Sequence, residues 1–250
     1  FTHIENAILE LGQSFGVKEP VLEQKIFSLI RTDKVKEAMK LIANQLGLPI
    51  EINITLVPND YSSQNSNNQF HSTHLAKIHQ HGSGSEGITA QVNIPSSLPI
   101  YGSPDLINYP INVKISENCT ESPVIFSLIM SHELSHVLLY SIRHSKKENE
   151  FYTDLTAIMH GFHNIFNNGR KDTETDVEYG YDTKTTRTQT TTYGYLDDDQ
   201  FYYAYEKIIL ILRRQRDKKK VLLKDLKKIK VLLFNYKKNL NIFKTHLEYL

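Results

Sequence analysis

Apolar residues in the first fifty positions recur with helical spacing. The clearest run extends from a Thr32 cap to Gly47, and one face of it collects Val35, Ala38, Met39, Ile42, Ala43 and Leu46. Pro49 follows and stops the helical pattern. Residues 1–50 are therefore expected to form an N-terminal helical segment.

Three later segments alternate apolar and polar residues, which is the pattern of half-buried strands. They are residues 52–56, 88–94 and 111–115. The polar, low-complexity residues 59–69 predict a loop, and the prolines between 95 and 110 exclude a central strand there. The middle of the chain thus predicts a small sheet.

Two helices are expected after these strands. Ser122 and Pro123 place a capping residue before a proline at the first helical position, and the apolar pattern continues to about Ile142. The residues from Ser145 to Glu148 have the pattern of a capping box, which opens a second helix. That helix is expected to run up to Gly169, which is placed to end it.

Residues 170–195 are mostly polar and rich in Thr, Tyr and Asp. A connection of this length is usually functional or disordered. Its near-symmetric Tyr-Gly-Tyr sequences, at 179–181 and 193–195, indicate a hairpin that serves as a lid.

The last fifty residues contain no Gly or Pro, and their apolar positions follow a four-three spacing. These positions are 201, 205, 208 and 212, then 222, 226, 229, 233, 236, 240, 243, 247 and 250. The spacing predicts a long amphipathic helix over 201–250. Two interpretations stay open: a coiled coil used for a protein partner or self-association, and a helix that packs its stripe on its own globular body.

Charge separates this helix from the rest of the chain. Residues 201–250 hold 14 Lys and Arg and 4 Asp and Glu, a net charge of +10, whereas residues 1–200 hold 15 and 24, a net charge of −9. A basic helix can mark a nucleic-acid contact. The apolar stripe explains the helix without nucleic acid, and no aromatic stacking platform lies among its lysines, so a solvated lysine face is favoured.

Composition excludes several classes of protein. The single cysteine, Cys119, excludes a disulfide framework and a cysteine-rich zinc module, and it favours a reduced, cytoplasmic setting. Cys119 itself is expected to be structural. No run approaches 18 apolar residues, so no membrane-spanning helix is expected.

An HExxH motif, His132-Glu133-Leu134-Ser135-His136, lies inside the helix expected at 123–142. Imidazoles four residues apart project from one helical face, which suits two corners of a tetrahedral zinc site. Glu133 lies about 100° further round the helix, where it can reach a metal-bound water. Two core histidines bonded to backbone carbonyls are the alternative, but this would not explain a glutamate in an otherwise uncharged run. The motif therefore predicts zinc.

A third protein ligand is needed. The pattern HExxHxxGxxH fails, because Leu139 and Ile142 occupy its glycine and third-histidine positions. Glu150 and Asp154 are four residues apart and share a face of the next expected helix. One carboxylate can bind zinc while the other holds a ligand imidazole through its free N–H. Alternatively, both simply favour a helix N-terminus electrostatically.

The sequence HELSH at 132–136, followed by NEFYTD at 149–154, resembles the gluzincin metallopeptidases, the thermolysin-like class. The resemblance covers residues 123–157. In that class a glutamate on the next helix completes the zinc site. The resemblance implies that the zinc ligands are His132, His136 and Glu150, that Glu133 is the general base, and that Asp154 orients His132.

The resemblance also implies the fold, an α+β zincin-like domain with a small sheet, the HExxH helix and a following helix. We expect this catalytic domain at residues 51–200, after the helical segment 1–50 and before the basic helix 201–250. Three departures stand out: the segment between the motifs is shorter than in thermolysin, Thr153 replaces the family's serine, and the family's downstream oxyanion histidine has no clear match.

A tetrahedral oxyanion needs a hydrogen-bond donor besides zinc. Tyr193 and Tyr195, at the end of the expected lid, are the candidates, with His160, His163 and Tyr179 behind them. A second histidine group lies in a polar segment whose spacing fits no standard zinc module. Its members are His71, His74, His79 and His81, which we interpret as scattered solvent histidines.

The sequence therefore predicts a zinc metallopeptidase that hydrolyses a protein or peptide substrate with a Glu133-activated water. The alternative is an inactive or latent zincin-fold interaction module, against which the intact Glu133 argues. A nucleic-acid-associated protein acting through residues 201–250 is the third choice.

Overall fold

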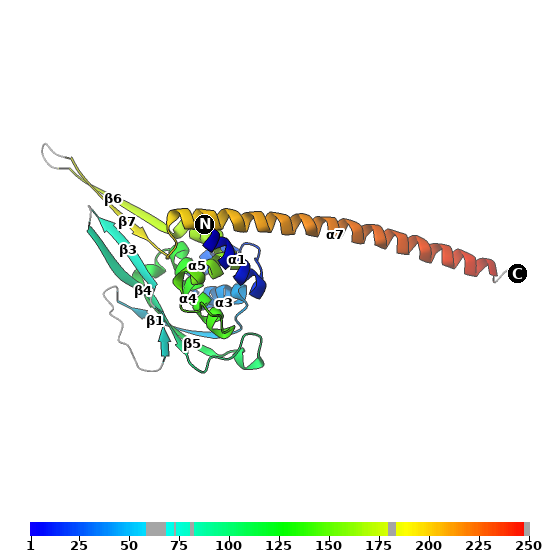
Figure 1. Ribbon diagram of the computed structural model, residues 1–250, viewed down its shortest axis with the longest axis horizontal. Coiled ribbons are helices and arrows are strands. Elements are labelled where there is room, and N and C mark those ends of the chain that lie inside the picture. The colour runs from blue at the N-terminus through cyan, green and yellow to red at the C-terminus, as the bar shows by residue number, and fades with distance from the viewer. Residues whose placement is uncertain (59–68, 73, 81–82, 180–183, 248–250) are drawn as a thin grey trace. The chain divides into compact units, whose positions relative to one another are not determined.

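The computed structural model describes residues 1–58, 69–72, 74–80, 83–179 and 184–247. They divide into two compact units, residues 1–205 and residues 206–250. The first unit combines a mixed sheet with a group of helices, so the expected α+β class is confirmed. Helices α1, α3, α4 and α5 gather on one side of the sheet (Figure 1).

Three helices open the chain, as expected: α1 (Thr2–Phe15), α2 (Glu23–Arg31) and α3 (Val35–Leu46). The expected Thr32 cap of α3 is wrong. Thr32 ends α2 instead, because its hydroxyl donates to the carbonyl of Ser28 at 2.8 Å, an alternative to capping that threonine often takes. Gly47 ends α3 in the left-handed conformation.

In the described part of the chain the sheet has seven strands. They are β1 (Glu51–Val57), β2 (Gln69–His71), β3 (His74–Gln80), β4 (Ser83–Pro95), β5 (Pro110–Ser116), β6 (Lys171–Tyr179) and β7 (Lys184–Thr192). Their order is β1-β5-β4-β3-β7-β6, with β2 paired to β4. Strands β1 and β5 are parallel, and the other pairs are antiparallel.

The three strands expected from alternation are present as β1, β4 and β5. A single 3₁₀ turn (Pro104–Leu106) and no strand lies between β4 and β5, as the prolines there predict. Most of the segment expected as a loop at 59–69 lies outside the described residues, but Gln69 begins β2. The expected sheet therefore lacked β2 and β3, which form by pairing with β4.

Helix α4 (Pro123–Ser141) has the expected bounds, and the Ser122 side chain accepts a hydrogen bond from the Ile125 amide at 3.4 Å. Every residue from Phe126 to Ser141 is buried. Contrary to the expectation from composition, α4 is long enough and apolar enough to cross a membrane, if length and composition alone are considered. In this structure 89% of its most apolar window is buried, so α4 is a core helix.

The second helix differs from the expectation at both ends. The capping box at Ser145 does not form. Instead α5 (Glu150–Ala157) begins after Asn149, whose side chain accepts a hydrogen bond from the Tyr152 amide at 3.3 Å. A π-helical turn (Ile158–Phe162) then separates α5 from α6 (His163–Gly169). Asparagine caps as well as serine does, so Asn149 can serve as the cap in place of Ser145.

Gly161 causes this interruption, because its φ of 96° lies outside the helical region. An added methyl group there would overlap the Glu19 carbonyl oxygen and lie 2.9 Å from Gln45 Nε2.

We expect Gly161→Ala to lower the free energy of unfolding by at least about 2 kcal/mol, measured by denaturant titration. Gly87→Ala is the control, since no atom lies within 4 Å of its added methyl; it should change stability by less than about 1 kcal/mol. Equal effects of both substitutions would contradict the assignment of strain to Gly161.

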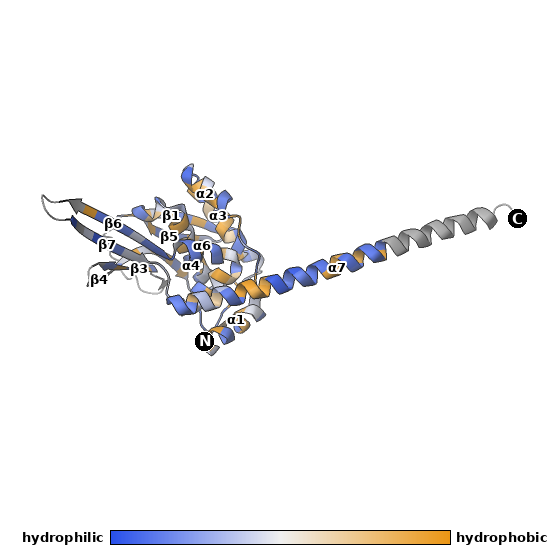
Figure 2. Ribbon diagram, turned by 90° about the horizontal axis from the view of Figure 1, so that it is seen from above, coloured by the Kyte–Doolittle hydropathy of each residue, from blue (hydrophilic) through white to orange (hydrophobic). Residues whose placement is uncertain are grey.

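The expected hairpin within residues 170–195 is present as β6 and β7, which pair along their whole lengths. Residues 180–183, between the two strands, lie outside the described part. Strand β7 also pairs with β3 from Lys77↔Thr192 to Gln80↔Gln189, so the hairpin extends the main sheet. Both strands are predominantly hydrophilic (Figure 2). Closure of this hairpin as a lid stays a prediction.

Helix α7 (Asp198–Leu247) confirms the expected long helix. Its stripe position Phe201 is buried in the first unit, as the packing interpretation requires. In the second unit the stripe positions Leu222, Leu226 and Ile229 are 51–61% exposed. Coiled-coil pairing of this exposed stretch stays a prediction.

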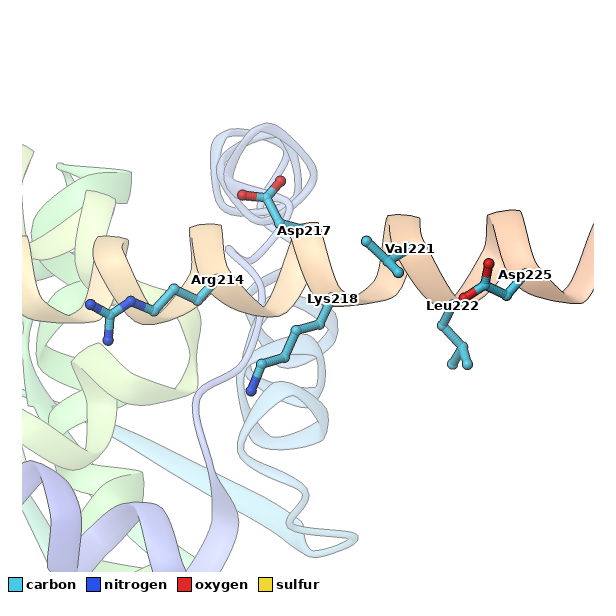
Figure 3. Close-up of a pocket in the computed structure, with 6 residues that line it drawn as sticks. All are labelled: Arg214, Asp217, Lys218, Val221, Leu222 and Asp225. Carbon is cyan, nitrogen blue, oxygen red and sulfur yellow. The ribbon is translucent and has the colours of Figure 1, made fainter.

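Figure 3 shows a shallow hollow along α7 in the second unit. The side chains that line it are Arg214, Asp217, Lys218, Val221, Leu222 and Asp225. Because all six come from successive turns of one helix, they form an open groove along its surface. It offers no enclosed place for a ligand.

Candidate metal centre

The HExxH histidines and Glu150 converge. His132 and His136 lie one turn apart on α4, and both are fully buried. Their Nε2 atoms lie 3.0 Å and 3.1 Å from the same oxygen, Glu150 Oε2. One ligand atom from each of the three residues lies within 4.8 Å of the others. This group can hold a metal ion, and its geometry does not by itself specify which metal.

The charges in this group favour a cation. Burial lowers the pKa of His132, but hydrogen bonds with Asp154 and Glu150 and their negative charges outweigh it and raise that pKa to about 10. Burial raises the pKa of Glu150, but hydrogen bonds with His132 and His136 and their charges hold it well below its usual range. Two carboxylates thus stabilise positive charge among the imidazoles, which a bound metal ion would supply instead of a proton.

Asp154 lies on the far side of His132 from Glu150. Its Oδ1 is 2.7 Å from His132 Nδ1, while its Oδ2 accepts hydrogen bonds from the amides of Tyr195 at 2.6 Å and Leu196 at 3.1 Å. A carboxylate at Nδ1 keeps the proton on that nitrogen and leaves the Nε2 lone pair for a metal. Asp154 therefore has the position expected for the residue that orients His132.

Thr153 plays a similar part for His136. Its hydroxyl donates to the Asn149 carbonyl at 3.2 Å and lies 3.3 Å from His136 Nδ1. Because the single hydroxyl proton is directed to the carbonyl, the hydroxyl oxygen is available to accept the His136 Nδ1 proton. Thr153, which replaces the serine of the gluzincin pattern, thus still supplies a hydroxyl in contact with the His136 imidazole.

The turn after β7 approaches the site closely. Gly194 has a φ of 88°, and an added methyl group would lie 3.1 Å from Asp154 Oδ2. The next residue, Tyr195, stacks on His132 with ring centroids 5.4 Å apart. A glycine is needed here because the chain is both left-handed and in contact with Asp154.

The two tyrosines expected as oxyanion donors have different surroundings. Burial raises the pKa of Tyr195, and the charges of Glu150 and Glu133 raise it further, so Tyr195 lies beside the candidate metal centre. Burial raises the pKa of Tyr193 to about 12, and its neighbours Cys119, Asp172 and Glu174 add to this effect. Of the two tyrosines, Tyr195 is the one placed beside the candidate metal centre.

The histidines named behind these tyrosines pack elsewhere in the first unit. His160 Nδ1 donates to the Thr156 carbonyl at 2.8 Å, and its ring lies 4.4 Å from that of Phe15. The buried His163 ring lies 5.8 Å from Tyr205. The side chain of Tyr179 lies outside the described part.

Glu133 is fully buried next to the ligands. Its Oε2 accepts a hydrogen bond from the Ser72 hydroxyl. Its Oε1 is buried and has no hydrogen-bond partner among the described residues. A buried carboxylate oxygen in this state calls for a donor that the described residues do not supply, such as water.

His74 corrects the interpretation of the second histidine group as solvent histidines. It is fully buried, and its ring stands perpendicular to that of His132 with centroids 4.8 Å apart. Burial lowers its pKa well below the usual value, and the neighbouring His132 adds to this effect. His79 is exposed as expected, and the side chains of His71 and His81 lie outside the described residues.

Sequence reasoning missed both Ser72 and His74, which reach the site from the start of β3 and the residues before it. One signal was available. His74, Ala76 and Ile78 alternate with exposed Lys77 and His79, which is strand periodicity over a short span. The surrounding polar residues hid that alternation.

Cys119 agrees with the structural role expected for it. It is buried, and burial raises the pKa of its thiol to about 12, which disfavours the reactive thiolate.

The first unit thus places two imidazoles and three carboxylates together. These groups come from α4 and α5, the turn after β7 adds Tyr195, and Ser72 and His74 add two more polar side chains. Comparison with protein-family models, with curated proteins and with solved structures finds no match to this chain, so its function has to be inferred from this geometry.

Proposed function

We propose that this protein is a zinc-dependent metallopeptidase of the gluzincin type. One observation carries the proposal: the Nε2 atoms of His132 and His136 meet the Glu150 carboxylate beside a buried Glu133 oxygen that has no partner in the described part of the chain. Two imidazoles and one carboxylate form a ligand set typical of catalytic zinc, which keeps a fourth position open.

A zinc ion held there would lower the pKa of a bound water to about 7 and polarise a substrate carbonyl. Glu133 would take a proton from the water that attacks the peptide carbonyl, and would then deliver that proton to the leaving amine. Asp154 holds His132 in the tautomer that binds the metal.

Metal analysis of the purified chain tests this proposal. We expect about one zinc per chain, removal of zinc by a chelator with loss of peptide hydrolysis, and recovery of both on adding zinc. The double variant His132→Ala, His136→Ala should retain no zinc. The control is His79→Ala, which removes an exposed imidazole and should retain it. Full zinc occupancy in the double variant would contradict the proposed ligand set.

A further inference from the structure

Two hydrogen-bond acceptors are buried at this site without a partner among the described residues. One is Glu133 Oε1 and the other is His74 Nε2. Both residues are fully buried. Leaving such atoms unpaired costs free energy, so their joint presence calls for a molecule that satisfies them.

The hydrogen bonds of Thr89 show that His74 Nε2 is an acceptor. The Thr89 hydroxyl donates its one proton to the His74 carbonyl at 3.1 Å, and the same oxygen lies 2.6 Å from His74 Nδ1. The hydroxyl must therefore accept the Nδ1 proton. A neutral imidazole with its proton on Nδ1 has a lone pair on Nε2.

Ring contacts place His74 beside the candidate metal centre. Nδ1 is directed to Thr89 on β4, so Nε2 lies on the opposite side of the ring. The His74 ring is nearly perpendicular to the rings of His132 and Tyr195, and its centroid lies 4.8 Å and 5.9 Å from theirs. After burial, the residues that change the pKa of His74 are His132, Glu150 and His136.

We infer that His74 is a further catalytic residue, whose Nε2 lone pair accepts a hydrogen bond from the attacking water. This inference rests on the proposed peptidase function. Water has two O–H groups, and the site offers two unpaired acceptors for them, Glu133 Oε1 and His74 Nε2. Holding both protons directs an oxygen lone pair of the water at the substrate carbonyl, which is the orientation that attack requires.

Glu133 and His74 have different roles in the reaction. Glu133 removes one water proton while the oxygen forms a bond to the carbonyl carbon and the carbonyl π electrons move to its oxygen. The C–N bond then breaks, and the amine takes the proton from Glu133. His74 keeps its Nδ1 proton and gains none. It accepts the hydrogen bond of the remaining O–H throughout, so it positions the nucleophile and does not store a proton.

Nitrogen NMR of the ¹⁵N-histidine-labelled wild-type chain tests the inference without relying on activity. We expect His74, assigned by its absence in His74→Phe, to show the Nδ1–H tautomer both without and with zinc. On zinc addition the Nε2 signals of His132 and His136 should move to metal-bound shifts, while that of His74 should not. A proton on His74 Nε2, or a metal-bound shift there, would overturn the inference, the second by making His74 a fourth ligand.

Kinetics of His74→Phe complete the test. Phe keeps a planar ring against His132 and Tyr195 but has no acceptor. We expect about one zinc per chain, as in the wild type, and a fall in kcat of about 10–100-fold with KM little changed. His79→Ala, on the same strand, should match the wild type.

The outcomes separate this inference from the proposed function. Zinc-dependent hydrolysis in the wild type, together with undiminished kcat in His74→Phe, would reject only the role of His74. Absence of bound zinc in the wild type would reject both.

Discussion

Replacing Glu133 by glutamine should lower kcat for peptide hydrolysis by about 10²–10⁴-fold and leave zinc content and fold unchanged. Glutamine has the same shape and can still accept the hydrogen bond from Ser72 through its amide oxygen. An amide cannot accept a proton from water at neutral pH, so only the proton-transfer function is removed. Buried among uncharged residues of α4, Glu133 has no neighbouring carboxylate on its own helix to replace it.

A peptide library digested by wild type and variant provides the measurement, with metal analysis and thermal unfolding on the same samples. Glu117→Gln is a matched control, because Glu117 is exposed and lies outside the candidate metal centre. It should cleave as the wild type does. Cleavage that persists undiminished in Glu133→Gln would rule out the proposed mechanism, since no other described carboxylate has an unpaired buried oxygen.

Glu150→Ala should lose zinc affinity far more than Asp154→Asn does. Glu150 places one oxygen against both ligand imidazoles, so alanine leaves only two protein ligands. Of the two ring nitrogens of His132, Asp154 contacts Nδ1 and not Nε2, so we expect Asp154→Asn to keep zinc with affinity lowered by about 10–100-fold. An amide NH₂ facing His132 Nδ1 would favour the other tautomer and weaken Nε2 as a ligand.

Competition with a chromophoric chelator would measure both affinities. Thermal unfolding of the zinc-free variants is the accompanying control, because Asp154 also accepts two backbone hydrogen bonds and its substitution can lower stability by itself. The reverse ranking, with Asp154→Asn losing zinc and Glu150→Ala keeping it, would make Asp154 the third ligand.

The parts of the site that the sequence predicted are those fixed by local structure. Ser122 and Pro123 begin α4 where their types indicate, and helical spacing then places His132 and His136 on one face. Glu150 and Asp154 share a face of α5 for the same reason, although that helix begins at a later residue than expected. An error of a few residues at a helix start changes no spacing within the helix.

The missing parts depend on contacts between distant segments. Ser72 reaches Glu133 across 61 positions of sequence, and His74 is fixed by Thr89 and by strand pairing. The contacts themselves have no signature in the sequence, although the alternation of His74, Ala76 and Ile78 indicates the strand. Gly161 falls inside the helix expected up to Gly169, and nothing local in the sequence indicates its positive φ or its close approach to Glu19. Packing between segments decides such positions.

The two amides that hold Asp154 have a consequence for the biosynthesis of the protein. A growing chain that has reached Asp154 already contains every proposed ligand, but the amides of Tyr195 and Leu196 are made 41 and 42 residues later. Until then the Asp154 carboxylate, which is 1% exposed in the folded protein, has only His132 as a partner that offsets the cost of its burial. Metal loading should therefore be a late event in the maturation of the nascent chain, and chains interrupted before residue 195 would carry the ligands without the support that orients them.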